Sequence, residues 1–173
     1  MTSPEVAIAY TYTALGQRAT MTLPGSRTVT YGYDPVTADL ATIENWSTAP
    51  APMSFSYTDD GRLEEIRRPT VLNTPAEDIV STYGYDTAGR LDAISHEQDG
   101  VYLAEYGYTL DATGNRERID VTGTAVANGY EAYTYDALDR VDYARYVDGG
   151  TATFGYDANG YRISLVAFCL TSY

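Results

Sequence analysis

A serine, a histidine and a glutamate are consecutive at one point of the sequence, Ser95-His96-Glu97. A hydroxyl, an imidazole and a carboxylate can form a nucleophilic triad when the three groups face one another. Neighbouring residues of a strand point to opposite faces, and no signal for a nucleophile-presenting turn accompanies His96. We therefore interpret His96 as a solvated loop residue, and we expect no catalytic residue and no enzymatic activity.

Aspartates recur along the chain and could supply the oxygen ligands that calcium prefers. None of them stands in the D-x-[DN]-x-[DN]-G spacing of a calcium loop. An aspartate that accepts hydrogen bonds from the backbone of its own turn explains the row without a metal. A zinc site made of His and Cys is impossible with one histidine and one cysteine, Cys169. We expect no metal and no cofactor. The aspartate row is Asp34, Asp86, Asp111, Asp136 and Asp157.

Arginine follows most of these turns and could form a basic row for an anionic ligand. The row consists of Arg18, Arg62, Arg90, Arg116, Arg140 and Arg162. The chain has 24 acidic residues against 11 basic ones, and its formal net charge is −13. So little positive charge disfavours a phosphate backbone, and we expect no nucleic-acid partner. We interpret the arginines as lying over tyrosine rings or bridging neighbouring aspartates.

Tyrosine dominates the aromatic residues, with 18 copies against three phenylalanines and one tryptophan. Exposed tyrosine rows can bind sugar rings through ring faces and hydroxyls, so surface carbohydrate is one candidate ligand. The alternative is a structural ladder in which each ring packs against its neighbours. We favour the ladder, because the aromatic positions coincide with the strand positions that define the repeat described next.

The elements that carry these residues form a repeat of about 24 residues. Each unit begins with two aromatic residues separated by one other, and the second of these positions falls at 12, 33, 57, 85, 110, 135 and 156. An Asp follows in most units, then a Gly, and then a segment of the form Arg-Leu-x-x-Ile. Tyr83-Gly84-Tyr85-Asp86 followed by Gly89-Arg90-Leu91 is a clear copy.

The chemistry of one unit predicts a β-hairpin. Two aromatics two residues apart lie on the same face of a strand. The Asp opens a turn, and the Gly can take the positive φ that closes a type I turn with a G1 bulge. The segment after the Gly then returns antiparallel. Turn residues such as Pro24-Gly25, Asp99-Gly100, Asn128-Gly129 and Asp148-Gly149 separate successive units. We predict an all-β meander of about 14 antiparallel strands.

Composition agrees with one globular array. The 173 residues are 44% hydrophobic and 20% charged, which is ordinary for a folded domain. No stretch approaches the ~20 apolar residues of a membrane-spanning helix, so no membrane insertion is expected. The first residues also lack the basic-then-apolar plan of a signal peptide. We predict a single repeat array over residues 1–173.

The recurrence of Tyr-Asp and Gly-Arg-Leu closely resembles the YD-repeat, or Rhs-repeat, family. That resemblance implies β-hairpins laid side by side in a long spiralling sheet, a structural role and an extracellular or cell-surface location. In full-length relatives such sheets wall a hollow shell around a toxin or form an extracellular barrel. Their self-cleaving DPxGL motif is absent here. The repeat-defining residues are Tyr31, Tyr33, Asp34, Tyr57, Gly61, Arg62, Tyr83, Tyr85, Asp86, Gly89, Arg90, Asp111, Gly114, Tyr133, Tyr135, Asp136, Arg140, Tyr156, Asp157 and Gly160.

The two ends of the array look uncapped. Residues 5–12 are strand-prone with one charge, and residues 163–173 form an apolar terminal strand. Neither end has the Lys, Pro or bulge signals that block an edge strand. We expect copies of the chain to pair head-to-tail into a filament or a larger wall, with a fragment of a toxin-encapsulating shell as the alternative. The predicted assembly residues are Val6, Ile8, Ile163, Leu165, Val166 and Phe168.

Overall fold

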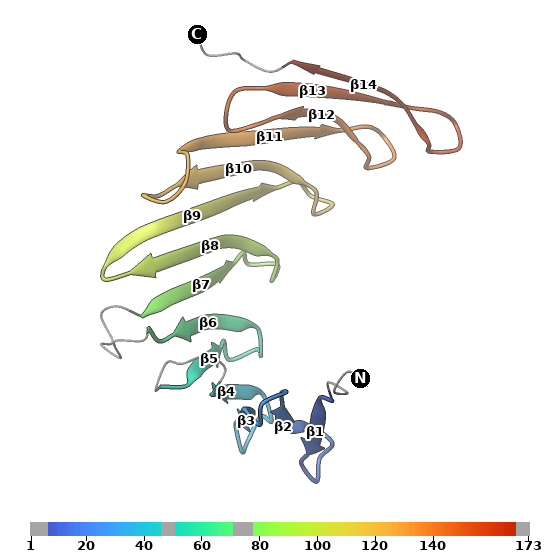
Figure 1. The fold of residues 1–173 in the computed structure, drawn as a ribbon. Helices are drawn as coiled ribbons and strands as arrows, with labels where there is room; N and C mark the ends of the chain where they lie inside the picture. Colours follow the sequence, from blue (N-terminus) through green and yellow to red (C-terminus); the bar gives the residue numbers. More distant parts are fainter. Residues whose placement is uncertain (1–6, 46–50, 71–77, 169–173) are drawn as a thin grey trace, which may run out of the picture. The chain divides into compact units, whose positions relative to one another are not determined.

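The computed structural model describes residues 7–45, 51–70 and 78–168, and in these residues every regular element is a β-strand. Hydrogen-bonded neighbours follow the chain order from β1 to β14 in one antiparallel sheet (Figure 1). The predicted all-β meander is therefore confirmed. The strands are β1 Ala9–Tyr12, β2 Arg18–Thr22, β3 Thr28–Tyr33, β4 Leu40–Glu44, β5 Met53–Tyr57, β6 Leu63–Arg68, β7 Ile79–Tyr85, β8 Leu91–Gln98, β9 Val101–Leu110, β10 Arg116–Thr122, β11 Gly129–Tyr135, β12 Val141–Arg145, β13 Thr151–Tyr156 and β14 Arg162–Phe168.

The chain divides into two compact units. The first comprises Met1–Ser81 with Gln98–Gly100, and the second comprises Thr82–Glu97 with Val101–Tyr173. Each unit is a layer of successive hairpins. No described helix is long and apolar enough to cross a membrane.

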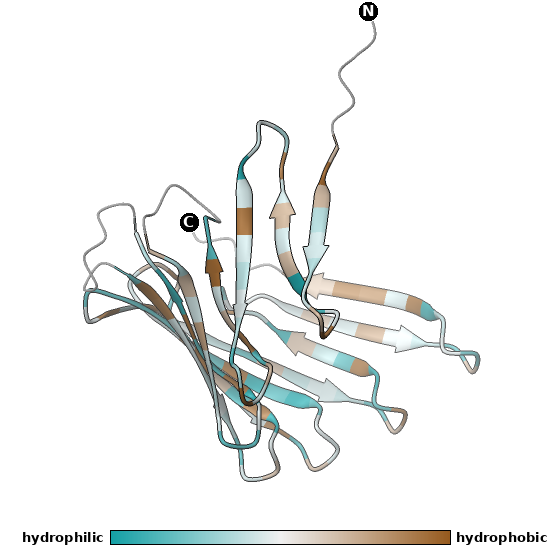
Figure 2. Cartoon of the chain, turned by 90° about the horizontal axis from the view of Figure 1, so that it is seen from below, coloured by the Kyte–Doolittle hydropathy of each residue, from teal (hydrophilic) through white to brown (hydrophobic). Residues whose placement is uncertain are grey.

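The register gives the sheet one aromatic and aliphatic face and one polar face. Tyr31 lies opposite Ile43, and the same kind of pair recurs where Phe55 meets Ile66. The other face carries short polar side chains, such as Thr20 opposite Thr30. Figure 2 shows brown and teal bands along the strands, which mark hydrophobic and hydrophilic residues. Among the described residues the buried apolar side chains are Val29, Ala104, Ile119, Val121, Ala144 and Ala152.

A β-bulge recurs at the same place in each hairpin for which the register is defined. In the first hairpin Thr11 lies opposite Thr20 but Tyr12 lies opposite Arg18, so one residue of the returning strand is skipped. The same shift occurs beside Tyr33, Tyr57, Leu110, Tyr135 and Tyr156. The bulge turns the first residue of each returning strand toward the aromatic face.

Two local expectations differ from the structure. His96 lies within strand β8, half-buried, and is not a solvated loop residue. The strand continues through this polar segment to Gln98, with β7 and β9 as its neighbours in the sheet. The connection predicted at Asn128-Gly129 also begins earlier, since Gly123 has a φ of 145° and its N–H donates to Asn128 Oδ1 at 2.8 Å, while Gly129 starts strand β11.

Candidate functional site

The turn aspartates accept hydrogen bonds from their own turns. The Gly89 N–H donates to the Asp86 carbonyl, and the Asp86 N–H donates to the Arg90 carbonyl, both at 2.9 Å. Asp86 Oδ1 accepts from the N–H groups of Ala88 and Arg90, also at 2.9 Å. The bond from the Arg90 backbone N–H, then that from the Arg90 side chain, and after them the bond from the Ala88 N–H hold the pKa of Asp86 below its ordinary value. The predicted turn chemistry is confirmed here.

The other turns follow the same plan with small variations. Gly61, Gly114 and Gly160 all have a φ between 81° and 97°, as Gly89 does at 80°. Asp139 takes this position in its hairpin with a φ of 57°. The turn after Tyr33 carries one more residue, and there Asp34 Oδ1 accepts from the N–H groups of Val36 and Thr37.

The six arginines of the predicted row occupy two different positions. Arg62, Arg90 and Arg140 directly follow the turn residue and pair with a carboxylate of their own turn. Arg90 Nε donates to Asp86 Oδ2 at 2.7 Å, and Arg90 Nη1 donates to the Asp111 carbonyl at 2.7 Å. This arginine therefore joins its own turn to the next turn of the array.

The remaining three arginines stand one residue later, on the aromatic face. Arg18, Arg116 and Arg162 lie opposite the second position of the aromatic pair, where other hairpins have Leu40, Leu63 or Val141. The guanidinium carbon of Arg116 lies 5.6 Å from the ring centroid of Tyr108 and 5.8 Å from that of Tyr133. Arg18 lies between two rings in the same way. The signal for this division was Gly-x-Arg in place of Gly-Arg.

In four of the joints between hairpins, a tyrosine hydroxyl links the strand that carries the aromatic pair to the hairpin before it. The hydroxyl of the second tyrosine donates to the carbonyl of the first residue of the preceding return strand, 15 to 19 residues earlier in the chain. The four bonds are Tyr33 to Arg18 at 2.9 Å, Tyr57 to Leu40 at 3.0 Å, Tyr135 to Arg116 at 2.8 Å and Tyr156 to Val141 at 2.8 Å. We call this contact the tyrosine tie. The sequence repeat does not indicate which group accepts this hydrogen bond.

Two further arginines that the repeat does not predict lie on either side of one ring. The guanidinium carbons of Arg118 and Arg145 are 3.9 Å and 3.8 Å from the Tyr130 ring centroid. Arg118 also pairs with Asp120 at 2.5 Å, and this carboxylate raises the pKa of Arg118. Both guanidinium groups therefore lie against the same aromatic ring.

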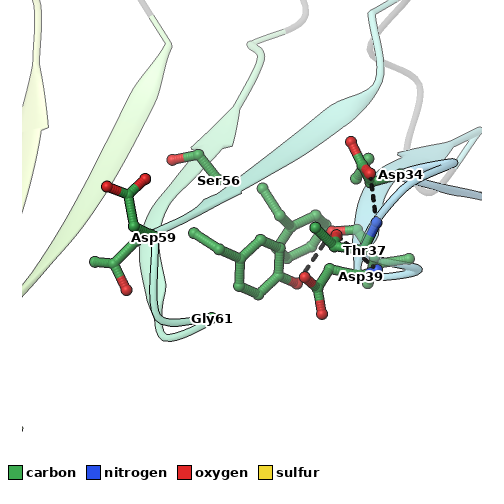
Figure 3. A pocket seen from close by; sticks show the side chains of 11 residues that line it. Asp34, Thr37, Asp39, Ser56, Asp59 and Gly61 are labelled. Atoms are coloured by element: carbon green, nitrogen blue, oxygen red, sulfur yellow. Dashed lines mark hydrogen bonds between the residues drawn. The ribbon is translucent and has the colours of Figure 1, made fainter.

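Two hollows lie along the aromatic face, one in each unit. The first has a volume of about 460 Å³ and lies between the turn that follows β3 and the turn that follows β5 (Figure 3). Asp34, Asp39 and Asp59 line it together with Phe55 and Tyr57. The second, of about 370 Å³, is lined by Arg90, Arg116 and Tyr108 with two leucines. Within the described residues, no three His, Cys, Asp or Glu side chains could hold a metal ion.

His96 lies beside an aromatic ring of the sheet. Its ring meets the ring of Tyr106 edge-on, with centroids 6.4 Å apart and an interplanar angle of 75°. Tyr83 and Tyr85 of the same unit lie on strand β7, as the Y-x-Y pattern predicts. The guanidinium groups of Arg90 and Arg140 pair with carboxylates of their own turns, and that of Arg90 also reaches the next turn.

The two outermost strands expose apolar side chains. Strand β14 pairs with β13 and strand β1 with β2, and each has no second neighbour within the described residues. Leu165 is 53% exposed and Ile8 is 48% exposed. Ile163, Val166 and Phe168 are exposed as well, whereas Val6 lies outside the described residues.

The fold has close counterparts among solved structures. No protein-family model and no curated protein matches the sequence. A chain in the crystal structure of TcdB2-TccC3-Cdc42 matches 95% of this chain with a TM-score of 0.77 and 18% identity. A chain in the Photorhabdus luminescens Tc holotoxin pore with the TccC3 mutation D651A also covers 95%, with a TM-score of 0.75 and 18% identity. This chain spans only 9% of either of them. It thus shares, over nearly its whole length, the fold of a short stretch of these much longer toxin-complex chains.

Proposed function

We propose that the chain is a non-enzymatic structural module of YD-repeat type, a length of β-hairpin wall that acts outside the cell. The observation that carries this proposal is the tyrosine tie, which recurs with the same donor and acceptor positions in four joints between hairpins. A contact that recurs from hairpin to hairpin lets a sheet extend by adding similar units. The fold shared with toxin-complex chains supports the same role.

The side chains of the repeat support a wall more than a ligand-binding surface. A sugar-binding tyrosine offers its ring face to the sugar, and its hydroxyl can add a polar contact. The hydroxyls of Tyr33, Tyr57, Tyr135 and Tyr156 instead donate to backbone carbonyls. Arg90 and Arg140 are likewise engaged with the carboxylates of their own turns. These hydroxyl and guanidinium groups of the repeat therefore bind other parts of the sheet.

A wall module extends by pairing its end strands, because an unpaired strand edge leaves backbone donors and acceptors that another strand can satisfy. We expect the purified chain at tens of micromolar to sediment well above its 18.9 kDa monomer mass. Electron micrographs should show filaments or larger walls. Deleting residues 163–173, which removes most of β14, should abolish assembly. A monomeric wild-type chain, or saturable binding on a glycan array that a Tyr57→Phe change abolishes, would contradict the proposal.

A further inference from the structure

Four joints between successive hairpins share one register. In each, the third residue after the start of a return strand lies opposite the second residue before the next aromatic pair. The four joints with a defined register give Met21 opposite Val29, Ile43 opposite Met53, Ile119 opposite Glu131 and Ala144 opposite Ala152. The tyrosine tie is present in all four. A single rule of register and bonding therefore describes how a Y-x-Y strand docks on a return strand.

Where the return strand starts with arginine, the docked strand also supplies an aromatic ring. Arg18 lies 4.9 Å from the Tyr10 centroid of its own hairpin and 5.5 Å from the Tyr31 centroid of the next hairpin. Arg116 lies between its own Tyr108 and the next hairpin's Tyr133. The joint after an arginine thus has three parts, which are strand pairing, a tyrosine tie and a second ring.

The two outermost strands each hold half of such a joint. Strand β14 begins with Arg162, which lies 5.9 Å from the Phe154 centroid and meets no second ring within the described residues. Strand β1 carries the pair Tyr10-Thr11-Tyr12, and its Tyr12 side chain is 62% exposed. The Tyr12 hydroxyl donates to no acceptor in the described part of the chain. Strand β14 thus offers the carbonyl that a tyrosine tie needs, and strand β1 offers the tyrosine hydroxyl.

We propose that strand β1 of a second copy docks on strand β14 through this same three-part joint. The inference rests on the proposed wall function and specifies its partner. The rule places Leu165 opposite Ile8 and Ser164 opposite Ala9 of the second copy. Tyr12 of that copy donates its hydroxyl to the Arg162 carbonyl, and the Tyr10 ring covers the Arg162 guanidinium.

The faces of the two strands agree with this register. Leu165 lies opposite Phe154 within its hairpin, so it belongs to the aromatic face. Ile8 stands two residues before Tyr10, which lies opposite Met21, so it belongs to the aromatic face as well. The docked pair is therefore apolar on apolar, as at Met21 opposite Val29 and Ile43 opposite Met53. Because the two contacting surfaces differ, the contact is head-to-tail and produces an open chain of copies unless its rotation closes a ring.

A charge-exchange experiment tests the pairing of residues 8 and 165. Ile8→Glu and Leu165→Arg each place an unpaired charge against an aliphatic side chain, so each variant alone should weaken assembly by at least about tenfold. In an equimolar mixture the Glu of one variant meets the Arg of the other, and the remaining joints are wild type. Sedimentation velocity should then show assembly restored. A mixture of Ile8→Glu with Leu165→Glu is the matched control, and it should stop at dimers held by the one wild-type joint, in which Leu165 meets Ile8.

Engineered cysteines test the register itself and do not depend on charged variants folding. In a Cys169→Ser background, Ala9→Cys with Ser164→Cys should cross-link into a ladder of covalent oligomers under mild oxidation. The control joins Ala9→Cys to Val166→Cys, on the same face but shifted by two residues, and should cross-link much less. Equal cross-linking of the two pairs overturns the register.

The outcomes separate the joint from the wall function. If the wild-type chain assembles but the two variants do not restore each other's assembly, the joint is wrong and the wall function stands. If the wild-type chain remains monomeric at tens of micromolar, the proposed function itself fails. Tyr12→Phe should weaken assembly with the melting temperature unchanged, because the hydroxyl it removes serves only the joint.

Discussion

The hydroxyl of the tyrosine tie explains why the second aromatic position holds tyrosine, although a phenylalanine ring would be buried equally well there. Phe55 and Phe154 occupy the first position of their aromatic pairs, whereas the second position holds the hydroxyl of each tyrosine tie. A half-buried hydroxyl needs a partner, and the carbonyl of the preceding hairpin provides it. The second aromatic position therefore links hairpins, and the first one covers the face.

The tyrosine tie should be measurable as stability. Tyr156→Phe removes the hydroxyl that donates to the Val141 carbonyl at 2.8 Å and leaves the ring in place. We expect a loss of about 1 kcal/mol in the free energy of unfolding, measured by urea denaturation. Tyr161→Phe is the control, because Tyr161 is 72% exposed and its hydroxyl makes no hydrogen bond in the described residues. Equal losses at the two positions would contradict the tie.

The turn carboxylates should make the fold sensitive to acid. The Arg90 backbone N–H, then the Arg90 side chain, lower the pKa of Asp86, and Arg62 lowers the pKa of Asp60 to about 2. A lowered folded-state pKa stabilises the fold above the unfolded value, near 3.8, and this contribution disappears as the pH falls toward the folded value.

Thermal unfolding followed by circular dichroism should therefore show a lower melting temperature at about pH 2 than at about pH 5. Asp86→Asn should reduce the melting temperature at neutral pH and make this pH dependence shallower. An unchanged slope in the variant would show that Asp86 does not contribute to it.

At the scale of the element, each hairpin is specified by its turn. Gly89 has a φ of 80°, a region where a β-branched residue is strained. Gly89→Val should therefore cost more than about 1 kcal/mol in unfolding free energy. Gly107→Val is the matched control in strand β9, because its Cβ would meet no atom within 4 Å and valine favours strands. Denaturant midpoints of the two variants should differ clearly, and similar midpoints would refute the turn assignment.

Gly84 is a less suitable control than its position in the middle of a strand suggests. A Cβ there would lie 3.1 Å from the Ala93 Cβ and 3.2 Å from Asp92 Oδ1. These neighbours on β8 would have to shift by a few tenths of an ångström. The glycine between two tyrosines thus permits close approach to the next strand.

For the whole molecule, composition limits the partners. A net charge of −13 with basic groups that are largely committed to rings and carboxylates leaves little to displace counterions from a phosphate backbone. Fluorescence anisotropy with duplex DNA at physiological salt should show no binding at micromolar chain concentrations. A submicromolar, salt-sensitive complex would overturn this expectation. Solubility should be lowest near the sequence pI of about 4.2, where self-repulsion vanishes.

The hairpins can be predicted from the amino-acid sequence alone, because their signals act within about a dozen residues of one another. Alternation in Tyr83-Gly84-Tyr85 places both rings on one face, and the Asp86 turn with Gly89 at positive φ reverses the chain. These are local backbone preferences, so they can be read without knowing which strands pair. The strand number and the antiparallel order follow from their repetition.

The contacts of each repeated side chain are visible in the tertiary structure and could not be predicted from the repeat. Arg90 and Arg116 both follow a glycine closely in the sequence, but they differ by one position relative to the bulge. Arg90 joins two turns, whereas Arg116 lies between two rings. The acceptor of each tyrosine tie is a backbone carbonyl in another hairpin, and a carbonyl leaves no mark in the sequence. Strand β8 includes His96 for a similar reason, because pairing with neighbouring strands outweighs the polar character of that segment. Contacts between hairpins depend on register, and register is set by pairing across the sheet.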